Sequence, residues 1–148
     1  MRMTKKTGKP AKTDRKPLAR KDYEALAGFR HALRQFLVFS EAAAIGAGLT
    51  PVQHQALLAI KGMPGPGPVS VGDLAAWLGV RPHSAAGLVD RLVKLGLVRK
   101  TQDAADRRRA TLTLTARAEH RLAALSAAHR EELRRMSGAL GALLAALS

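Results

Sequence analysis

An alternating segment in the C-terminal half constrains the fold more than any other feature. Residues 103–115, DAADRRRATLTLT, place three consecutive arginines before a run of alternating apolar and polar residues. Ala110, Leu112 and Leu114 fall on one side of the alternation, and threonines fall on the other. Strict alternation is typical of a half-buried β-strand. The sequence therefore predicts a strand whose entrance carries guanidinium groups.

Helical patterns dominate the rest of the chain. Residues 22–46 have apolar side chains at three- and four-residue spacing, which predicts a long amphipathic helix. Thr50 as N-cap and Pro51 at the first helical position predict a second helix that ends near Lys61. The following GMPGPGP is expected to be a loop, because glycine and proline interrupt regular structure.

Two short helices and a hairpin follow in an informative order. Ser70 with Asp73 forms a capping box that begins one short helix, and Pro82 begins another. Two short helices joined by a tight, glycine-containing turn are a candidate helix-turn-helix. Residues 97–101 and 110–114 are expected to pair as strands. A hairpin directly after a helix-turn-helix is a wing, and the two signals together are more specific than either alone.

The C-terminal third returns to alanine, leucine and charged residues. A long helix is expected to about Met136, then a break at Ser137 and Gly138, then a final apolar helix to Leu147. The stretch ALGALLAAL has no reason to face water, and an exposed stripe of this kind marks an interface. This segment is therefore expected to contribute to a homodimer.

Length and charge limit the classes of function. The chain has 148 residues, which favours one domain, and a net charge of +14. Residues 1–20 are interpreted as a disordered basic arm, either a solubilising tail or a source of phosphate contacts. Beyond residue 21 the chain still has 16 basic and 10 acidic residues. A polyanionic partner is therefore expected, with nucleic acid first and an anionic membrane surface second.

Several classes of protein are disfavoured. No apolar run approaches the roughly 18 residues that a transmembrane helix needs, and no secretory signal precedes the domain, so a cytoplasmic protein is expected. No segment combines a basic face with a bulky apolar one, which argues against a membrane partner. The chain has no cysteine, and its five histidines lack metal-binding spacing. We therefore expect no catalysis, no metal and no cofactor.

Taken together, these motifs resemble the MarR (multiple antibiotic resistance regulator) family of winged helix-turn-helix transcription factors. The resemblance implies a mainly α fold with a small β-wing (α+β), formed by a domain over residues 21–148. Residues 22–48 and 116–148 would form a dimerisation layer, and residues 50–115 would bind DNA. Two positions depart from the family pattern, because Ala118 and Gly87 replace a usual glycine and a common polar residue. The motifs that carry the resemblance are LTPVQHQALLAI at 49–60, VGDLAAWLGV at 71–80, GLVDRLVKLGLV at 87–98 and DRRRATLTLT at 106–115.

By this resemblance, residues 82–95 form the recognition helix, whose first turn approaches base edges in the major groove. Arg81 at the N-cap cannot cap well and opposes the helix dipole, which indicates either a DNA ligand or a solvated arginine. Gly87 either lets the backbone approach DNA or is tolerated at about 1 kcal/mol. Asp90 is expected to pair with a nearby arginine, since DNA would repel a free carboxylate. The other candidate DNA contacts on this helix are His83, Ser84, Arg91 and Lys94.

In the wing, Arg108 matches the family arginine that enters the minor groove, where a narrow groove concentrates negative potential. Asp106 is expected to orient a neighbouring guanidinium in a bidentate pair. Arg107 and Arg109 are expected to project from the other side of the hairpin and meet phosphates.

The aromatic residues of the first helix have two interpretations. Tyr23, Phe29, Phe36 and Phe39 either pack in the core and dimer or partly line an effector pocket, as the resemblance implies. Phe29, Arg30 and Phe36 are the candidate pocket residues, and a basic lining from Arg30 or Arg34 would suit an anionic aromatic ligand.

The expected function is a sequence-specific transcriptional regulator. It would bind double-stranded DNA at a palindromic operator as a homodimer, as a repressor, with release by a small-molecule effector as a further possibility. The alternative is a non-specific nucleic-acid-binding or architectural protein that acts through its positive charge. Binding to palindromic and random DNA at several salt concentrations separates the two.

Overall fold

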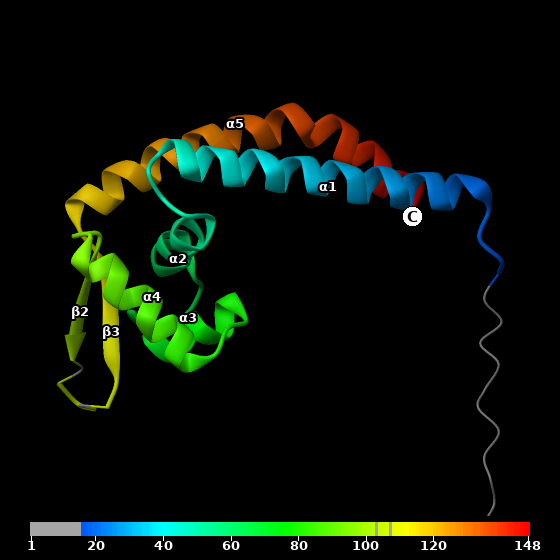
Figure 1. Ribbon diagram of the computed structural model, residues 1–148. Helices are drawn as coiled ribbons and strands as arrows, with labels where there is room; N and C mark the ends of the chain where they lie inside the picture. Colours follow the sequence, from blue (N-terminus) through cyan, green and yellow to red (C-terminus); the bar gives the residue numbers. More distant parts are fainter. Residues whose placement is uncertain (1–15, 103, 107) are drawn as a thin grey trace, which may run out of the picture.

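The computed structural model describes residues 16–102, 104–106 and 108–148. Two long helices, α1 and α5, lie side by side, and the remaining elements hang below one end of this pair (Figure 1). We call α1 and α5 the helical layer, and residues 50–115 the winged region. The elements are α1 (Arg20–Gly46), α2 (Pro51–Gly62), β1 (Val69–Ser70), α3 (Val71–Leu78), α4 (Pro82–Lys94), β2 (Val98–Gln102), β3 (Ala110–Leu114) and α5 (Ala116–Ala146).

Short-range capping explains where the helices of the winged region begin. The Thr50 hydroxyl accepts the Gln53 N–H at 3.2 Å, and the Gln53 side chain accepts the Thr50 N–H at 3.0 Å. The same reciprocal pair joins Ser70 and Asp73, at 2.9 and 3.0 Å. These bonds satisfy N–H groups that the first helical turn leaves unpaired. The predicted starts of α2 and α3 are thereby confirmed.

The sheet has three antiparallel strands in the order β1-β3-β2. The predicted wing hairpin is confirmed, with Val98 opposite Leu114 and Lys100 opposite Leu112. Strand β1 was not expected, and it pairs Val69 with Leu112 on the other side of β3. It has only two residues after a glycine- and proline-rich loop, so it is too short to show periodicity. Strand β1 anchors the wing to the start of α3.

The hydrophobic core lies in the winged region and under the first turns of α5. Its side chains come from α2, α3, α4 and the sheet, with Leu122 and Leu125 from α5. Each leucine buried here stabilises the fold by about 1.5–3 kcal/mol relative to an exposed one. The largest fully buried side chains are Leu57, Leu74, Val89, Leu92, Leu97 and Leu112.

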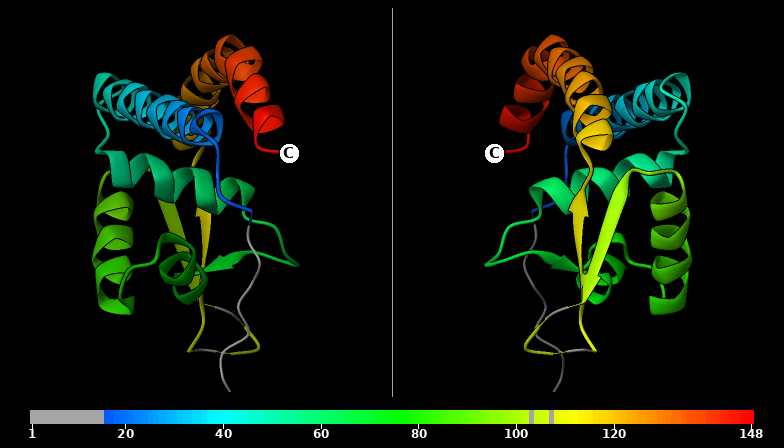
Figure 2. Two further views of the ribbon diagram at one scale, coloured as in Figure 1. Left: turned by 90° about the vertical axis from the view of Figure 1, so that its right-hand side faces the viewer. Right: turned by 90° about the vertical axis from the view of Figure 1, so that its left-hand side faces the viewer.

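Helix α5 is continuous from Ala116 to Ala146, so the predicted break at Ser137 and Gly138 is wrong. The Ser137 hydroxyl donates to the Arg134 carbonyl at 2.7 Å, which keeps this side chain within the helical turn. A glycine costs a helix only about 1 kcal/mol, and the flanking alanines and leucines favour helix. The ribbon curves along its length instead of breaking (Figure 2).

The helical layer buries little of its apolar surface. The expected apolar face of α1 is divided, because Phe29 and Phe36 are half-buried whereas Leu26, Leu33 and Leu37 are exposed. Gly28 allows close packing of the two helices, since a Cβ placed there would lie 2.8 Å from a methyl carbon of Leu143.

Among the described residues no single helix is long and apolar enough to cross a membrane. Only α1 and α2 together, bent by 95°, have the length and composition.

Candidate nucleic-acid interface

The first turn of α4 is presented to solvent by the packing of its opposite face. Ala85, Leu88, Val89 and Leu92 are buried, so the opposite side of the helix faces solvent. Arg81, at the N-cap, makes no side-chain capping bond, as expected from its chemistry. The exposed residues of α4 and its N-cap include the predicted contacts Arg81, His83, Ser84, Arg91 and Lys94.

Gly87 is not required by packing within the chain. A Cβ at this position would meet nothing closer than a terminal nitrogen of Arg91, at 3.6 Å, which is an ordinary contact. Its backbone lies in a regular helix, without the positive φ that favours glycine. The structure therefore supplies no internal reason for the roughly 1 kcal/mol that a helical glycine costs.

The tip of the wing is organised by Asp106 in a way that differs from the expectation. Its carboxylate accepts the backbone N–H of Arg108 at 3.0 Å, and its carbonyl accepts the N–H of Arg109 at 3.0 Å. Among the described residues it forms no ion pair with a guanidinium; Arg107 lies outside them. The carboxylate of an aspartate often accepts the backbone N–H of the residue two positions later, and this hydrogen bond stabilises a turn. Asp106 thus orients the wing through the main chain.

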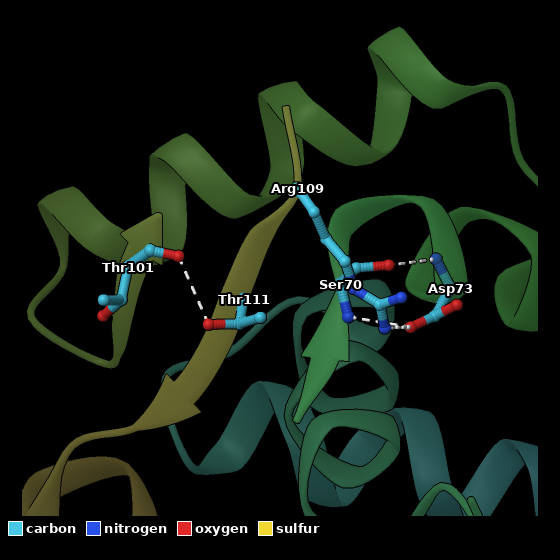
Figure 3. A network of polar contacts seen from close by, with 5 residues as sticks. All are labelled: Ser70, Asp73, Thr101, Arg109 and Thr111. Atoms are coloured by element: carbon cyan, nitrogen blue, oxygen red, sulfur yellow. Dashed lines mark hydrogen bonds and ion pairs between the residues drawn. The ribbon is translucent and has the colours of Figure 1, made fainter. Parts of the chain in front are cut away.

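Arg109 connects the wing to the helix-turn-helix. One of its guanidinium nitrogens lies 3.1 Å from the carboxylate of Asp73, at the start of α3 (Figure 3). The backbone N–H of Ser70, then its side chain, and to a smaller extent Arg109, lower the pKa of Asp73. Both side chains are nearly half exposed, so the pair contributes little stability. The expected contact of Arg109 with a DNA phosphate would therefore compete with its ion pair to Asp73.

A cleft of about 400 Å³ lies between the wing, the start of α3 and α4. Lys100, Arg108 and Arg109 contribute positive charge to its lining, which exceeds the single negative charge of Asp106, and Ala86 contributes the surface of α4. Lys100 also lies 3.8 Å from Asp90, so Asp90 pairs with a lysine and not with an arginine as expected. The guanidinium of Arg108 is exposed and has no ionic partner among the described residues. The cleft is thus suited to an anionic ligand.

A second site lies between the helical layer and α2. A cavity of about 470 Å³ is mainly apolar and contains Phe36, one of the three predicted pocket residues; Phe29 and Arg30 do not line it. The lining consists of Phe36, Leu37, Ser40, His54, Gln55, Leu58, Ser126, His129, Arg130 and Leu133.

His54 and His129 were not anticipated, because nothing local in the sequence links α2 to the middle of α5. Their ring centroids are 4.8 Å apart. His129 Nδ1 lies 2.6 Å from the Leu125 carbonyl, and its Nε2 lies 2.8 Å from the Ser40 hydroxyl. A carbonyl only accepts, so Nδ1 of His129 donates to the Leu125 carbonyl. Burial, and then the charge of His129, lower the pKa of His54.

Comparisons with known proteins agree with this geometry. Residues 47–109 match the model of the MarR family. An uncharacterized HTH-type transcriptional regulator of Bacillus subtilis, YcgE, is 36% identical over 93 residues, which are 62% of this chain and 58% of that protein. The match thus spans less than two thirds of the relative.

Solved structures share the fold. The S. aureus MepR–DNA complex is 20% identical and has a TM-score of 0.64, over 80% of this chain and 84% of that one. CouR from Rhodococcus jostii, bound to p-coumaroyl-CoA, is 24% identical with a TM-score of 0.60, over 72% of this chain and 73% of that one.

Proposed function

We propose that the protein is a sequence-specific DNA-binding transcriptional regulator of the MarR family, whose model matches residues 47–109. One observation carries the proposal. The first turn of α4 is exposed, and α4 and Arg108 of the wing line the same cationic cleft. One ligand can therefore contact both elements.

In the proposed complex, α4 enters the major groove. Arg81, His83 and Ser84 then face base edges or phosphates, and Gly87 brings the helix backbone close to the DNA. Arg91 and Lys94 approach phosphates. Arg108 enters the adjacent minor groove, where a narrow groove attracts a guanidinium most strongly. Asp106 supports this placement because it holds the backbone at Arg108.

We propose that the regulator acts as a homodimer on a palindromic operator. Two stripes of exposed leucines support this assembly, at helical spacing on α1 and α5. Contiguous exposed apolar surface of this kind is typical of an interface. A two-fold dimer would place its two α4 helices about 34 Å apart, one turn of DNA. The stripes consist of Leu26, Leu33 and Leu37 on α1, and of Leu133 and Leu144 on α5 with Leu147 at its C-cap.

We further propose a repressor that a small anionic aromatic effector releases. The cavity between α1, α2 and α5 adjoins both the helical layer and the helix that supports the winged region. Phe36 supplies an aromatic wall, and Arg130 supplies positive charge. Cavities of about 300–1,000 Å³ with few polar groups are typical ligand sites.

Quantitative DNA binding tests the proposal. Palindromic and random duplexes are compared by fluorescence anisotropy at several salt concentrations. A specific regulator retains a preference of at least about 10³-fold for its operator, whereas a charge-driven protein shows none. Equal affinity for both duplexes at every salt concentration would contradict the proposal.

Three arginine substitutions separate readout from charge. Arg81→Ala is expected to change base preference within the half-site, by about 1–3 kcal/mol for a bidentate contact. Arg108→Ala is expected to lose most affinity on operators with A·T-rich flanks. Arg34→Ala is the matched control, since Arg34 is exposed on α1, away from the winged region. A loss from Arg108→Ala that is independent of the flank would place this guanidinium on phosphate.

The predicted basic arm, residues 1–20, lies largely outside the described residues. We propose that it binds DNA phosphates. Its deletion would then weaken binding to all DNA alike and flatten the dependence of log K on log salt, by about 0.9 for each phosphate that the arm neutralises. An unchanged slope would assign it a solubilising role.

A further inference from the structure

We propose that the effector site also accepts elongated amphipathic acids, whose carboxylate lies at Arg130 and whose apolar chain crosses α2 to reach Trp77 on α3. The proposal rests on the regulatory function above and adds a second apolar subsite to the cavity already described. It predicts that ligand length, and not only an anionic aromatic group, determines affinity.

The subsite is a separate cavity of about 320 Å³ between α2 and α3. It meets the cavity between α1, α2 and α5 at two residues, Gln55 and Leu58, which line both. The two hollows therefore adjoin on the exposed face of α2, and we call the pair the trough. The lining of the second cavity consists of Gln55, Leu58, Ala59, Gly62, Met63, Trp77 and Leu78.

The two ends of the trough differ in chemistry. At the α5 end, Arg130 is exposed and forms no ion pair with any described residue, so its charge is available to a ligand. The Ser40 hydroxyl and His129 lie at the same end. At the α3 end the side chains are almost all apolar. A ligand that satisfies both ends combines an anionic group with a long apolar body.

Trp77 supports the occupation of the apolar end. Its side chain is 57% exposed and that of Leu58 is 47% exposed, although both are large and apolar. Neighbouring exposed apolar residues around a hollow indicate a binding site more than a chance distribution does. Trp77 also lies on α3, two residues before the tight turn at Gly79 that leads to α4. A ligand that contacts Trp77 therefore touches the helix-turn-helix directly.

A homologous series of probes tests ligand length. Butanoate, octanoate, decanoate and decan-1-ol are titrated into the full-length protein by calorimetry. Among acids long enough to reach α3, affinity is expected to rise about fourfold for each added methylene, the gain from burying one CH₂. Trp77 is the only tryptophan in the chain. Its fluorescence is expected to shift with decanoate and to stay unchanged with butanoate.

Substitutions at the two ends separate the contributions. Trp77→Ala and Trp77→Phe are compared with Val80→Ala, an exposed apolar control outside both cavities. Trp77→Ala is expected to weaken decanoate about tenfold and leave butanoate unchanged, and Trp77→Phe is expected to retain much of the decanoate affinity. Arg130→Gln is expected to weaken acids about ten- to hundredfold and leave decan-1-ol unchanged. Arg134→Gln, which alters a neighbouring arginine of α5 outside the cavities, is the control.

DNA binding is measured on every variant without ligand, so that failure of the proposed ligand site can be told apart from failure of the regulatory function. Decanoate affinity that is the same as that of butanoate, or that Trp77→Ala does not change, would overturn the α3 subsite. Absence of binding by every acid, with operator binding intact, would overturn the proposed ligand and leave the regulatory function standing. Absence of a preference for the operator over random DNA in the unsubstituted protein would contradict the regulatory function itself.

Discussion

The helical layer and the winged region are built from similar residues but bury them differently. Leu57, Leu74 and Leu92 of the winged region are fully buried, whereas Leu26 and Leu37 of α1 are about half exposed. In the winged region helices and strands surround a common centre, so the inner face of each element meets another. Two long helices side by side cover only one stripe of each. The comparison teaches that the winged region closes a core within one chain, whereas the helical layer leaves part of its apolar surface uncovered.

The largest expected effect comes from the core of the winged region. Leu92→Ala removes a side chain with no exposed surface and is expected to lower the free energy of unfolding by about 2–5 kcal/mol. Leu95→Ala, near the end of the same helix and 46% exposed, is expected to cost less than about 1 kcal/mol. Urea denaturation measures both. Equal losses would show that the winged region does not hold the core described here.

The next effect concerns the helical layer. Leu33→Glu places a charge in the exposed leucine stripe and is expected to weaken self-association by at least the burial of one leucine, about 1.5–3 kcal/mol. Ala27→Glu introduces the same charge on the side of α1 that carries Arg34 and Glu41, and is expected to leave assembly intact. Sedimentation at micromolar concentration distinguishes the two. A monomer in the unsubstituted protein would remove the basis of the comparison.

Two helical glycines, one in each region, separate stability from DNA binding. Gly87→Ala and Gly138→Ala meet no close contacts and are each expected to raise the free energy of unfolding by about 1 kcal/mol. Only Gly87→Ala is expected to weaken operator binding, because its methyl group would lie between α4 and the DNA. Thermal denaturation and anisotropy test the pair. Unchanged affinity in Gly87→Ala would mean that the backbone of α4 does not approach the DNA closely.

The smallest expected effect is a pH dependence where the two regions meet. Burial, and then His129, hold the pKa of His54 below its ordinary value near 6.5. The unfolded chain therefore binds this proton more readily, and stability is expected to fall as pH decreases below about 6.5. His54→Gln should reduce this slope, and His31→Gln, exposed on α1, should not. Identical slopes between pH 5.5 and 7.5 in all three proteins would exclude His54 as the source.

Much of the fold follows from interactions between residues close in sequence. The capping pairs at Thr50 and Ser70, the helix start at Pro82 and the alternation at 110–114 all act within a few residues, and all occur where they were predicted. The predicted DNA contacts on α4 are exposed for the same reason, because helical periodicity alone decides which side faces the core.

Tertiary packing decided the features that join distant segments. Strand β1 exists because β3 offers it a partner, and Arg109 reaches Asp73 only once the wing lies against α3. The packing of α2 against α5 brings His54 beside His129, a contact that no local sequence pattern predicts. At Ser137 and Gly138, local signals overstated the effect of two weak helix formers on a helix that continues through them. Sequence patterns report the energies of neighbouring residues, whereas these contacts depend on where the folded chain places surfaces that are far apart along it.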